Sequence, residues 1–189
     1  MVALGVVSLL NDAASEMVVP LLPALLTVTL GGGAVWVGVV EGLADGLASV
    51  VKWAAGRRSD RRGRRKPFLV AGYGLAALVR PLIALATSPV HVLLVRLTDR
   101  IGKGVRTAPR DALLAAAVTS TQRGRAFGFH RAMDHLGAAI GPLVAWALLS
   151  LGADIRTVIA CSVVPGVLVL AVLGAGVREE APLPAQVRA

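Results

Sequence analysis

Two apolar runs are separated by one strongly basic stretch, Gly56-Arg57-Arg58-Ser59-Asp60-Arg61-Arg62-Gly63-Arg64-Arg65-Lys66. Seven of the twenty Lys and Arg residues of the chain lie here, beside a single acid, Asp60. A basic connection between apolar segments is typical of membrane proteins, because such connections stay on the cytoplasmic side of the bilayer. This stretch therefore predicts a polytopic membrane protein and fixes its orientation.

The composition supports a membrane protein. Of the 189 residues, 56% are hydrophobic and 16% are charged, and the mean hydropathy is +0.73, whereas soluble domains have about 25% charged residues. The net charge of +9 would by itself favour a nucleic-acid binder. However, the charges interrupt apolar runs, so no nucleic-acid partner is expected. The single cysteine, Cys161, excludes an internal disulfide framework and a cysteine zinc site.

Glycine, proline and charge signals divide the chain into six apolar segments, each close to the ~20 residues that a membrane helix needs. We expect spans at residues 2–30, 34–55, 67–86, 90–110, 124–151 and 155–177. The fold class is thus an all-α, polytopic membrane protein. The polar residues 178–189 are expected to form a cytoplasmic tail, and no cleavable signal peptide is expected.

The connections have unequal charge. Residues 56–66 and the region around 106–125 are basic, whereas the other connections are short and nearly uncharged. The two basic connections and both termini are therefore expected in the cytoplasm, and the chain in the cytoplasmic (inner) membrane.

Polar residues inside three spans fall on one helical stripe each at 100° per residue. These stripes are Ser8, Asp12, Ser15 and Glu16; Glu41, Asp45, Ser49 and Lys52; and Arg96, Asp99, Arg100, Lys103 and Arg110. Charges inside a bilayer are costly and normally face protein or water. The stripes predict a bundle with a polar interior, in which acids of the first two spans face bases of the fourth.

These stripes supply the candidate substrate and proton pathway: Asp12, Glu16, Glu41, Asp45, Arg96 and Arg100. A carboxylate in a partly dry cavity can carry a proton at neutral pH. The alternative is that these acids and bases only neutralise one another. Arg80 is expected to reach the interface or to form a structural pair. His130 and Asp134 suggest either a relay or hydrogen bonds that anchor a loop.

Three motifs resemble the major facilitator superfamily. The stretch 56–66 is similar to its signature G-x-x-x-D-R-x-G-R-[RK]-[RK] between the second and third helices. Arg100-Ile101-Gly102-Lys103-Gly104 resembles its fourth-helix motif. Gly128, Gly137 and Gly141-Pro142 resemble its fifth-helix motif, in which glycines permit close helix packing. Residues 11–17, 99–112 and 123–134 are similar to a prokaryotic branch whose substrates are largely uncharacterised.

The resemblance implies half of the superfamily fold, the N-terminal six helices, arranged as two inverted three-helix repeats. It implies that the tail begins a linker to a second six-helix half, supplied by the same chain or by a dimer partner. It also implies a cytoplasmic gating loop, in which Asp60 and Arg64 contact the fourth helix and the other half. The gating residues are Gly56, Asp60, Arg61, Gly63, Arg64 and Arg65.

The sequence therefore predicts secondary active transport of a small solute by alternating access. Proton coupling is expected from the carboxylates, and efflux rather than uptake from the fifth-helix motif, which is commonest among antiporters. The alternative is a non-transporting six-helix subunit or remnant that packs against a partner through its glycine-rich fifth helix. An enzyme is not favoured, because no nucleophile–base set or metal-ligand pair is recognisable. No metal or cofactor is expected.

Overall fold

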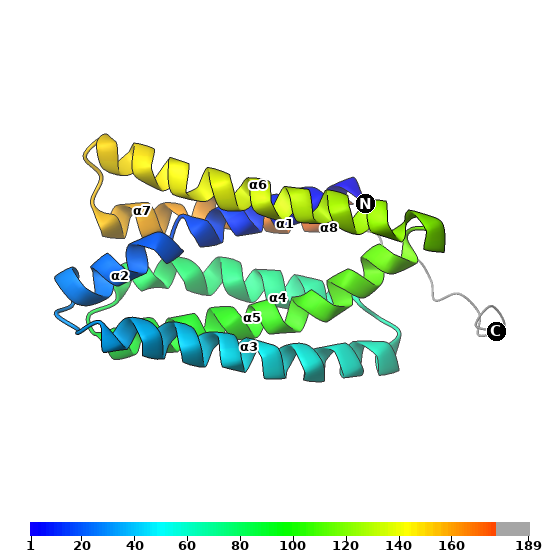
Figure 1. The fold of residues 1–189 in the computed structure, drawn as a ribbon, viewed down its shortest axis with the longest axis horizontal. Helices are drawn as coiled ribbons and strands as arrows, with labels where there is room; N and C mark the ends of the chain where they lie inside the picture. Colours follow the sequence, from blue (N-terminus) through cyan, green and yellow to red (C-terminus); the bar gives the residue numbers. More distant parts are fainter. Residues whose placement is uncertain (177–189) are drawn as a thin grey trace.

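The computed structural model describes residues 1–176, and within them every regular element is helical. Six helical rods cross the bundle side by side (Figure 1). In chain order they are α1 (Val2–Glu16) with η1 (Val19–Leu21), α2 (Leu22–Ala24) and η2 (Leu25–Thr29); α3 (Val35–Arg62); α4 (Lys66–Val79) with η3 (Arg80–Leu85); α5 (Pro89–Ala116); α6 (Arg123–Ser150), preceded by η4 (Ser120–Gln122); and α7 (Ile155–Cys161) with α8 (Val163–Gly176).

Local sequence signals end and begin these helices. Gly63 ends α3 in the left-handed conformation, with φ of 64°, and its N–H donates to the Ser59 carbonyl at 3.0 Å. The Ser88 side chain caps α5, and Pro89 occupies its first turn. Asp154 caps α7 by accepting from the Thr157 N–H at 3.1 Å. Hydrogen bonds from Thr157 lower the pKa of this exposed carboxyl group.

The two ends of the bundle differ in chemistry. At one end, which we call the apolar end, the first, third and sixth rods depart from α geometry, partly because Pro20, Pro23 and Pro81 cannot donate an N–H. A buried cluster fills this end: Val18, Leu22, Leu25, Leu26, Val40, Ile83, Ala84, Ala86, Val92 and Ile159. The opposite end, which we call the basic end, carries the α3–α4 and α5–α6 connections, Met1 and the exposed arginines of α3.

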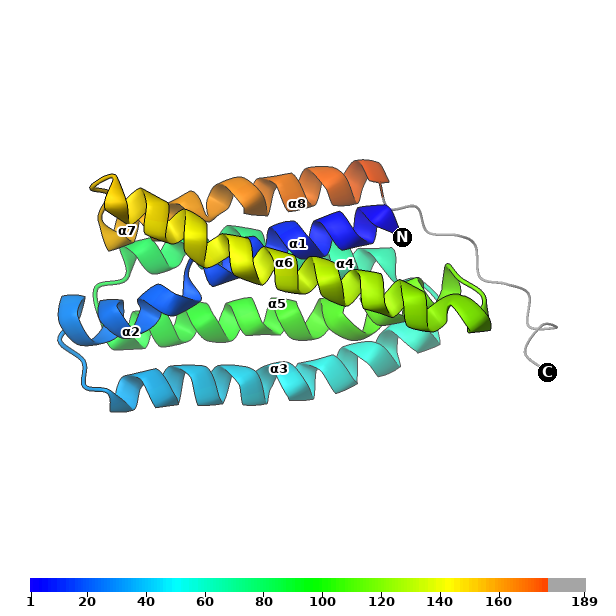
Figure 2. The ribbon, with the colours of Figure 1, turned by 45° about the horizontal axis from the view of Figure 1, so that its top comes forward.

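Helices of the first half of the sequence pack mainly on helices of the second half. The first rod packs through α1 on α6 and α8, and the fourth rod, α5, packs on α3 and α4. The third and sixth rods contact each other through α4 and α8. Rods one to three and rods four to six thus form two triplets. The first rod of each triplet packs on the second and third rods of the other triplet, as a pseudo-two-fold axis between inverted repeats requires. Figure 2 shows α1, α4 and α8 adjacent in this arrangement. The predicted six-helix fold class is confirmed.

Four rods are long and apolar enough to cross a membrane by length and composition: Val2–Thr29, Lys66–Leu85, Ser120–Ser150 and Ile155–Gly176. The other two rods, α3 and α5, carry the charged stripes. Much of the charge on α5 faces inward, with Arg96, Asp99, Arg100 and Arg106 all buried. Average hydropathy underestimates the ability of such a helix to cross a membrane, because the average includes charged residues that neighbouring helices cover.

Two helices are longer than the spans expected from hydropathy. Helix α3 continues to Arg62 rather than stopping near Ala55, and α5 continues to Ala116 rather than Arg110. Hydropathy falls where a helix leaves the apolar layer, but the backbone continues as helix until Gly63 ends it. Most of the expected 56–66 loop is therefore the last two turns of α3. Val177 and the expected tail at 178–189 lie outside the described residues.

Candidate functional site

A buried ion-pair network holds the fourth rod against its neighbours. The Asp99 carboxylate accepts from Arg80 Nη2 at 3.0 Å and from Arg96 Nη1 at 3.3 Å. Arg80 also donates to the carbonyl and side-chain oxygens of Asn11 at 3.4 and 3.5 Å. This network joins α1, η3 and α5. Arg80 therefore forms a structural pair, as one of its two interpretations predicted.

The network continues onto α3 through the predicted pathway residues. Arg96, whose side chain is completely buried, contacts Glu41 at 2.7 Å, and Arg100 contacts Glu41 at 3.5 Å and Asp45 at 3.2 Å. Because α3 packs directly on α5, Glu41 pairs with Arg96 at an interhelical contact rather than across open space. For Glu41 and Arg96, the expectation of acids and bases facing one another across a cavity is replaced by mutual neutralisation.

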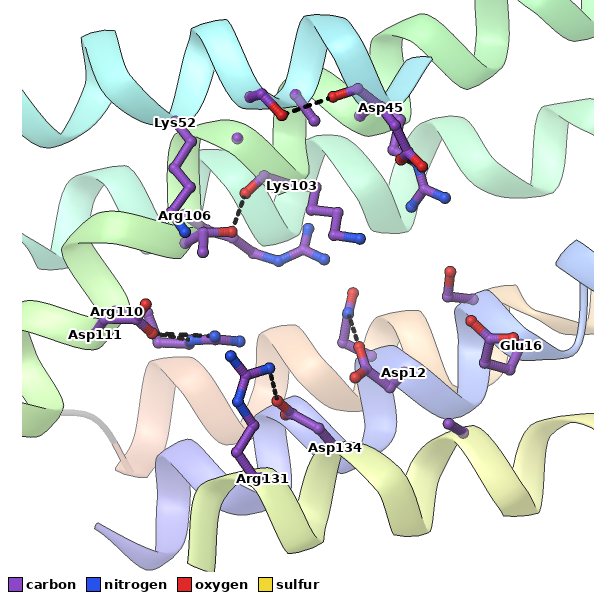
Figure 3. Close-up of a pocket in the computed structure, with 18 of the residues that line it drawn as sticks. Asp12, Glu16, Asp45, Lys52, Lys103, Arg106, Arg110, Asp111, Arg131 and Asp134 are labelled. Atoms are coloured by element: carbon purple, nitrogen blue, oxygen red, sulfur yellow. Dashed lines mark hydrogen bonds and ion pairs between the residues drawn. The ribbon is translucent and has the colours of Figure 1, made fainter. Parts of the chain in front are cut away.

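A central cavity of about 580 Å³ opens between α1, α3, α5 and α6 (Figure 3). Four predicted pathway residues line it, namely Asp12, Glu16, Asp45 and Arg100, whereas Glu41 and Arg96 do not. The remaining lining residues are Asn11, Ser15, Ala48, Ser49, Lys52, Lys103, Gly104, Arg106, Thr107, Arg110, Asp111, Arg131, Asp134, His135 and Ala138. The charged stripes of three rods thus converge on one polar chamber.

The α1 wall of the cavity presents two carboxylates that no basic side chain neutralises directly. Asp12 accepts from the side-chain amide of Asn11 at 2.9 Å, and Glu16 lies one turn further along the same face. Neither forms an ion pair with any residue of 1–176. Asp12 and Glu16 are half-buried and line the cavity, so both carboxyl groups are accessible from it.

A second polar cluster ties α6 to α1 at the cavity floor. Ser8 donates to Asp134 and lies 3.4 Å from His130 Nε2. Arg110 Nη1 donates to Ser8 at 3.3 Å, so α5 joins the same cluster. Both His130 and Asp134 are buried. Of the two predicted roles, hydrogen bonds that anchor a loop are not found, because the partners of His130 and Asp134 lie inside helices, and the relay stays a prediction.

The predicted gating residues lie at the basic end of α3 and in its connection to α4. Asp60, Arg61, Gly63 and Arg64 are exposed, and Gly56 and Arg65 are partly buried. Arg65 donates to the Ala112 carbonyl of α5 at 3.3 Å. Asp60 and Arg64 make no ion pair with residues 1–176, so both remain available at the surface.

The glycines of the predicted packing motif have different surroundings. A Cβ on Gly137 would collide with the Leu9 carbonyl of α1, and a Cβ on Gly141 would lie 2.6 Å from the Ala13 carbonyl. Nothing lies within 4 Å of a Cβ on Gly128. Pro142 follows within α6 and is partly buried. Only the second part of the motif therefore brings α6 close to α1.

Several central residues were missing from the predicted site. Asp99 and Lys103 lay on the predicted stripe of the fourth span, but their roles depend on which helix faces them. Arg106 and Arg131 gave no sequence signal that separates them from surface charges, and Asp134 was noticed only through its spacing from His130. Within residues 1–176, no group of three His, Cys, Asp or Glu side chains could hold a metal ion.

Comparison with known proteins identifies the family. The sequence model of the Major Facilitator Superfamily matches residues 4–189. An uncharacterised MFS-type transporter of Methanocaldococcus jannaschii is 39% identical over 138 residues, covering 73% of this chain and 34% of the relative. The multidrug resistance protein MdtH of Proteus mirabilis is 34% identical over 143 residues, covering 73% of this chain and 34% of the relative.

One further relative bears the name "Probable 4-methylmuconolactone transporter", from Cupriavidus pinatubonensis. It is 36% identical over 130 residues, covering 69% of this chain and 30% of the relative. The matched part of the chain thus spans about a third of the length of each of these relatives.

Among solved structures, a bacterial homolog of the human lysosomal transporter Spinster, inward-facing and occupied, superposes with a TM-score of 0.80 at 20% identity. The superposition covers 94% of this chain and 43% of that one. Fold, motifs and family match agree: this chain belongs to the major facilitator superfamily of membrane transporters.

Proposed function

We propose that this chain is one half of a secondary transporter that moves a small solute across the cytoplasmic membrane by alternating access. The observation that carries the proposal is the central polar cavity, because it collects charged residues from four rods in the middle of an otherwise apolar bundle. Buried charge in a membrane protein is costly and is characteristic of solute and ion pathways. The two relatives whose names include the word transporter support the same function.

We propose protons as the coupling ion and Asp12 and Glu16 as the groups that carry them. Both carboxylates face the cavity without a basic partner in ion-pair contact, unlike Asp45, which contacts Arg100 at 3.2 Å. A carboxylate held by arginine stays ionised, whereas one without such a pair can gain and lose a proton during a cycle. The fifth-helix motif and the MdtH relative favour efflux over uptake.

The second wall of the site belongs to a second six-helix half, in the same polypeptide or in a partner. The relatives are about three times as long as the matched region, which supports a continuous polypeptide. We place the basic end in the cytoplasm, since seven Lys and Arg residues gather at 57–66. There the exposed Asp60 and Arg64 would contact the other half and would have to release it in each cycle.

The test is proton flux in everted membrane vesicles that contain the intact protein. A pH-sensitive quenched dye reports the gradient, and 4-methylmuconolactone, the solute named for one relative, is then added as the probe. Solute-dependent recovery of fluorescence is expected for the wild type and is expected to disappear in the Asp12→Asn/Glu16→Gln variant. The control Asp154→Asn keeps a good helix cap at an exposed turn and should behave as the wild type.

The competing function is a membrane subunit or remnant without transport. Its expected partner surface, the glycine-rich face of α6, is partly occupied, because Gly137 and Gly141 already pack on α1. An antibody against residues 57–66 would separate the two functions by reading the mass of the intact polypeptide. A band at about twice the 19.4 kDa of this chain supports the transporter. A 19.4 kDa band together with absent proton flux would favour the subunit.

A further inference from the structure

The charges of the cavity are not balanced pair by pair. Three of its six basic side chains contact acids of the same wall: Arg100 with Asp45 at 3.2 Å, Arg110 with Asp111 at 3.1 Å, and Arg131 with Asp134 at 3.7 Å. The other three, Lys52, Lys103 and Arg106, make no ion pair with residues 1–176. These three unpaired cations all come from α3 and α5, whereas the two unpaired carboxylates, Asp12 and Glu16, come from α1.

Arg106 is the most informative of the three. The residue is only 5% exposed, and its guanidinium stacks on the Tyr73 ring at 4.5 Å and donates to the Gly72 carbonyl at 3.4 Å. These contacts orient the guanidinium but do not neutralise it. A buried cation without an ion-pair partner is costly, and an anionic ligand in the adjoining cavity would supply the missing charge.

Close packing brings the two lysines to the same place. A Cβ on Gly104 would lie 2.8 Å from the Ala48 carbonyl, so the α3 backbone approaches α5 closely here. Lys52 follows Ala48 by one turn, and Lys103 directly precedes Gly104. Figure 3 shows Lys52, Lys103 and Arg106 on one side of the cavity, with Asp12 and Glu16 on the other.

The rest of the lining limits the size and polarity of a ligand. Ala48 and Ala138 are the only apolar side chains among the lining residues. This wall therefore offers few apolar side chains to an acyl chain or a large aromatic group, which argues against a lipid. Resting on the proposed transport function, we propose that Lys52, Lys103 and Arg106 form a subsite for the anionic group of a compact, hydrophilic solute.

Charged thiol reagents test the sign of this subsite without knowledge of the natural solute. The variants Ser49→Cys, in the cavity, and Ala34→Cys, exposed at the apolar end, are made in a Cys161→Ser background of the intact, detergent-solubilised protein. Each reacts with negatively charged sulfonatoethyl methanethiosulfonate and with its positively charged trimethylammonioethyl analogue. The ratio of the negative to the positive rate is expected to be roughly tenfold or more higher at position 49 than at position 34.

The Lys52→Gln/Lys103→Gln variant is expected to remove most of that difference. Arg58→Gln is the matched control, because it removes a positive charge from α3 at an exposed position outside the cavity. An unchanged ratio in the double lysine variant, or a faster reaction of the positive reagent at position 49, would overturn the proposal.

Protection against the reagent then tests ligand binding. Isethionate and inorganic phosphate should slow modification at position 49, while choline and glycerol at the same osmolarity should not. Protection by choline alone, or by neither anion, overturns the anionic subsite. Proton flux in vesicles that persists in such a case would leave the proposed transport function standing. Conversely, anion protection without any flux would support the subsite and contradict transport.

Discussion

The molecule holds two groups of charges that lie side by side and are organised in opposite ways. In the paired network, formed by Glu41, Arg80, Arg96, Asp99 and Arg100, each charge contacts an opposite charge within 3.5 Å. Among the cavity charges, defined as Asp12, Glu16, Lys52, Lys103 and Arg106, none does so within residues 1–176. Both groups share α5, so the same helix serves two purposes.

The difference separates structure from function. Buried charges that neutralise one another hold the helices in register, and they are not available to bind a ligand. Charges that face the cavity without such a contact are not neutralised by the protein, so a proton or a charged solute could neutralise them. The paired network should therefore govern stability, and the cavity charges should govern transport. Five substitutions test this division, from the largest expected loss of stability to the smallest.

Asp99→Asn should cause the largest loss of stability. It removes the negative partner of both Arg80 and Arg96 at a site where Asp99 is 1% exposed, and breaking a buried ion pair costs about 3–5 kcal/mol. The free energy of unfolding in detergent, measured by denaturant titration, checks this. Asp154→Asn, at an exposed turn, is the control. A loss below about 1 kcal/mol would mean that the network is not a structural support.

Gly104→Ala should cost an intermediate amount, about 1–3 kcal/mol, through overpacking against α3. The new methyl group would meet Val51 at 2.7 Å and the Ala48 carbonyl at 2.8 Å. Because α3 carries partners in both groups, transport should fall as well. In the matched variant Gly46→Ala the methyl group meets nothing within 4 Å. Equal unfolding energies for the two variants would contradict close packing of α3 on α5.

Asp12→Asn should change stability by less than about 1 kcal/mol, since only the Asn11 hydrogen bond is affected. Its effect should appear in transport, as the loss of the dependence of solute flux on an imposed pH gradient. Asp45→Asn should lower the flux more mildly, because Asp45 already contacts Arg100. An unchanged pH dependence in Asp12→Asn would remove Asp12 from the proton pathway, and the same result in Asp45→Asn would remove Asp45.

Asp60→Ala should leave the unfolding energy within about 0.5 kcal/mol of the wild type, since the side chain is exposed. Transport by the intact protein should slow nonetheless, because the proposed gate contact to the other half is lost. Expression and unfolding measured beside initial rates separate the two effects. Wild-type rates would show that Asp60 does not gate.

Helical phase depends only on local geometry, so a sequence alone can show which polar residues share one face of a helix. Asp12, Glu16, Asp45 and Arg100 were placed on polar stripes and do line one cavity. Which stripe meets which could not be predicted, because pairing depends on tertiary packing. For that reason Glu41 was assigned to an open pathway, whereas it contacts Arg96 at 2.7 Å.

Helix ends show a similar limit. Hydropathy reports where a segment leaves an apolar environment, so it placed the end of the second span near Ala55. The backbone ends its helix only at Gly63, where a residue without Cβ adopts a positive φ. The close approach of Gly137, but not Gly128, to a neighbouring helix likewise depends on which face of α6 meets α1, and a sequence motif does not specify this.

The buried cluster at the apolar end has an electrical consequence. Aliphatic side chains from five of the six rods form a buried cluster at that end, whereas charged side chains line the cavity. A membrane voltage falls mainly across the material of low dielectric constant, so most of it should fall across this cluster rather than across the cavity. One elementary charge carried through this end would gain or lose about 2.3 kcal/mol for each 100 mV of membrane voltage. The apolar end would thus act as the insulating layer of a small capacitor, and turnover that moves net charge would depend on voltage at that step.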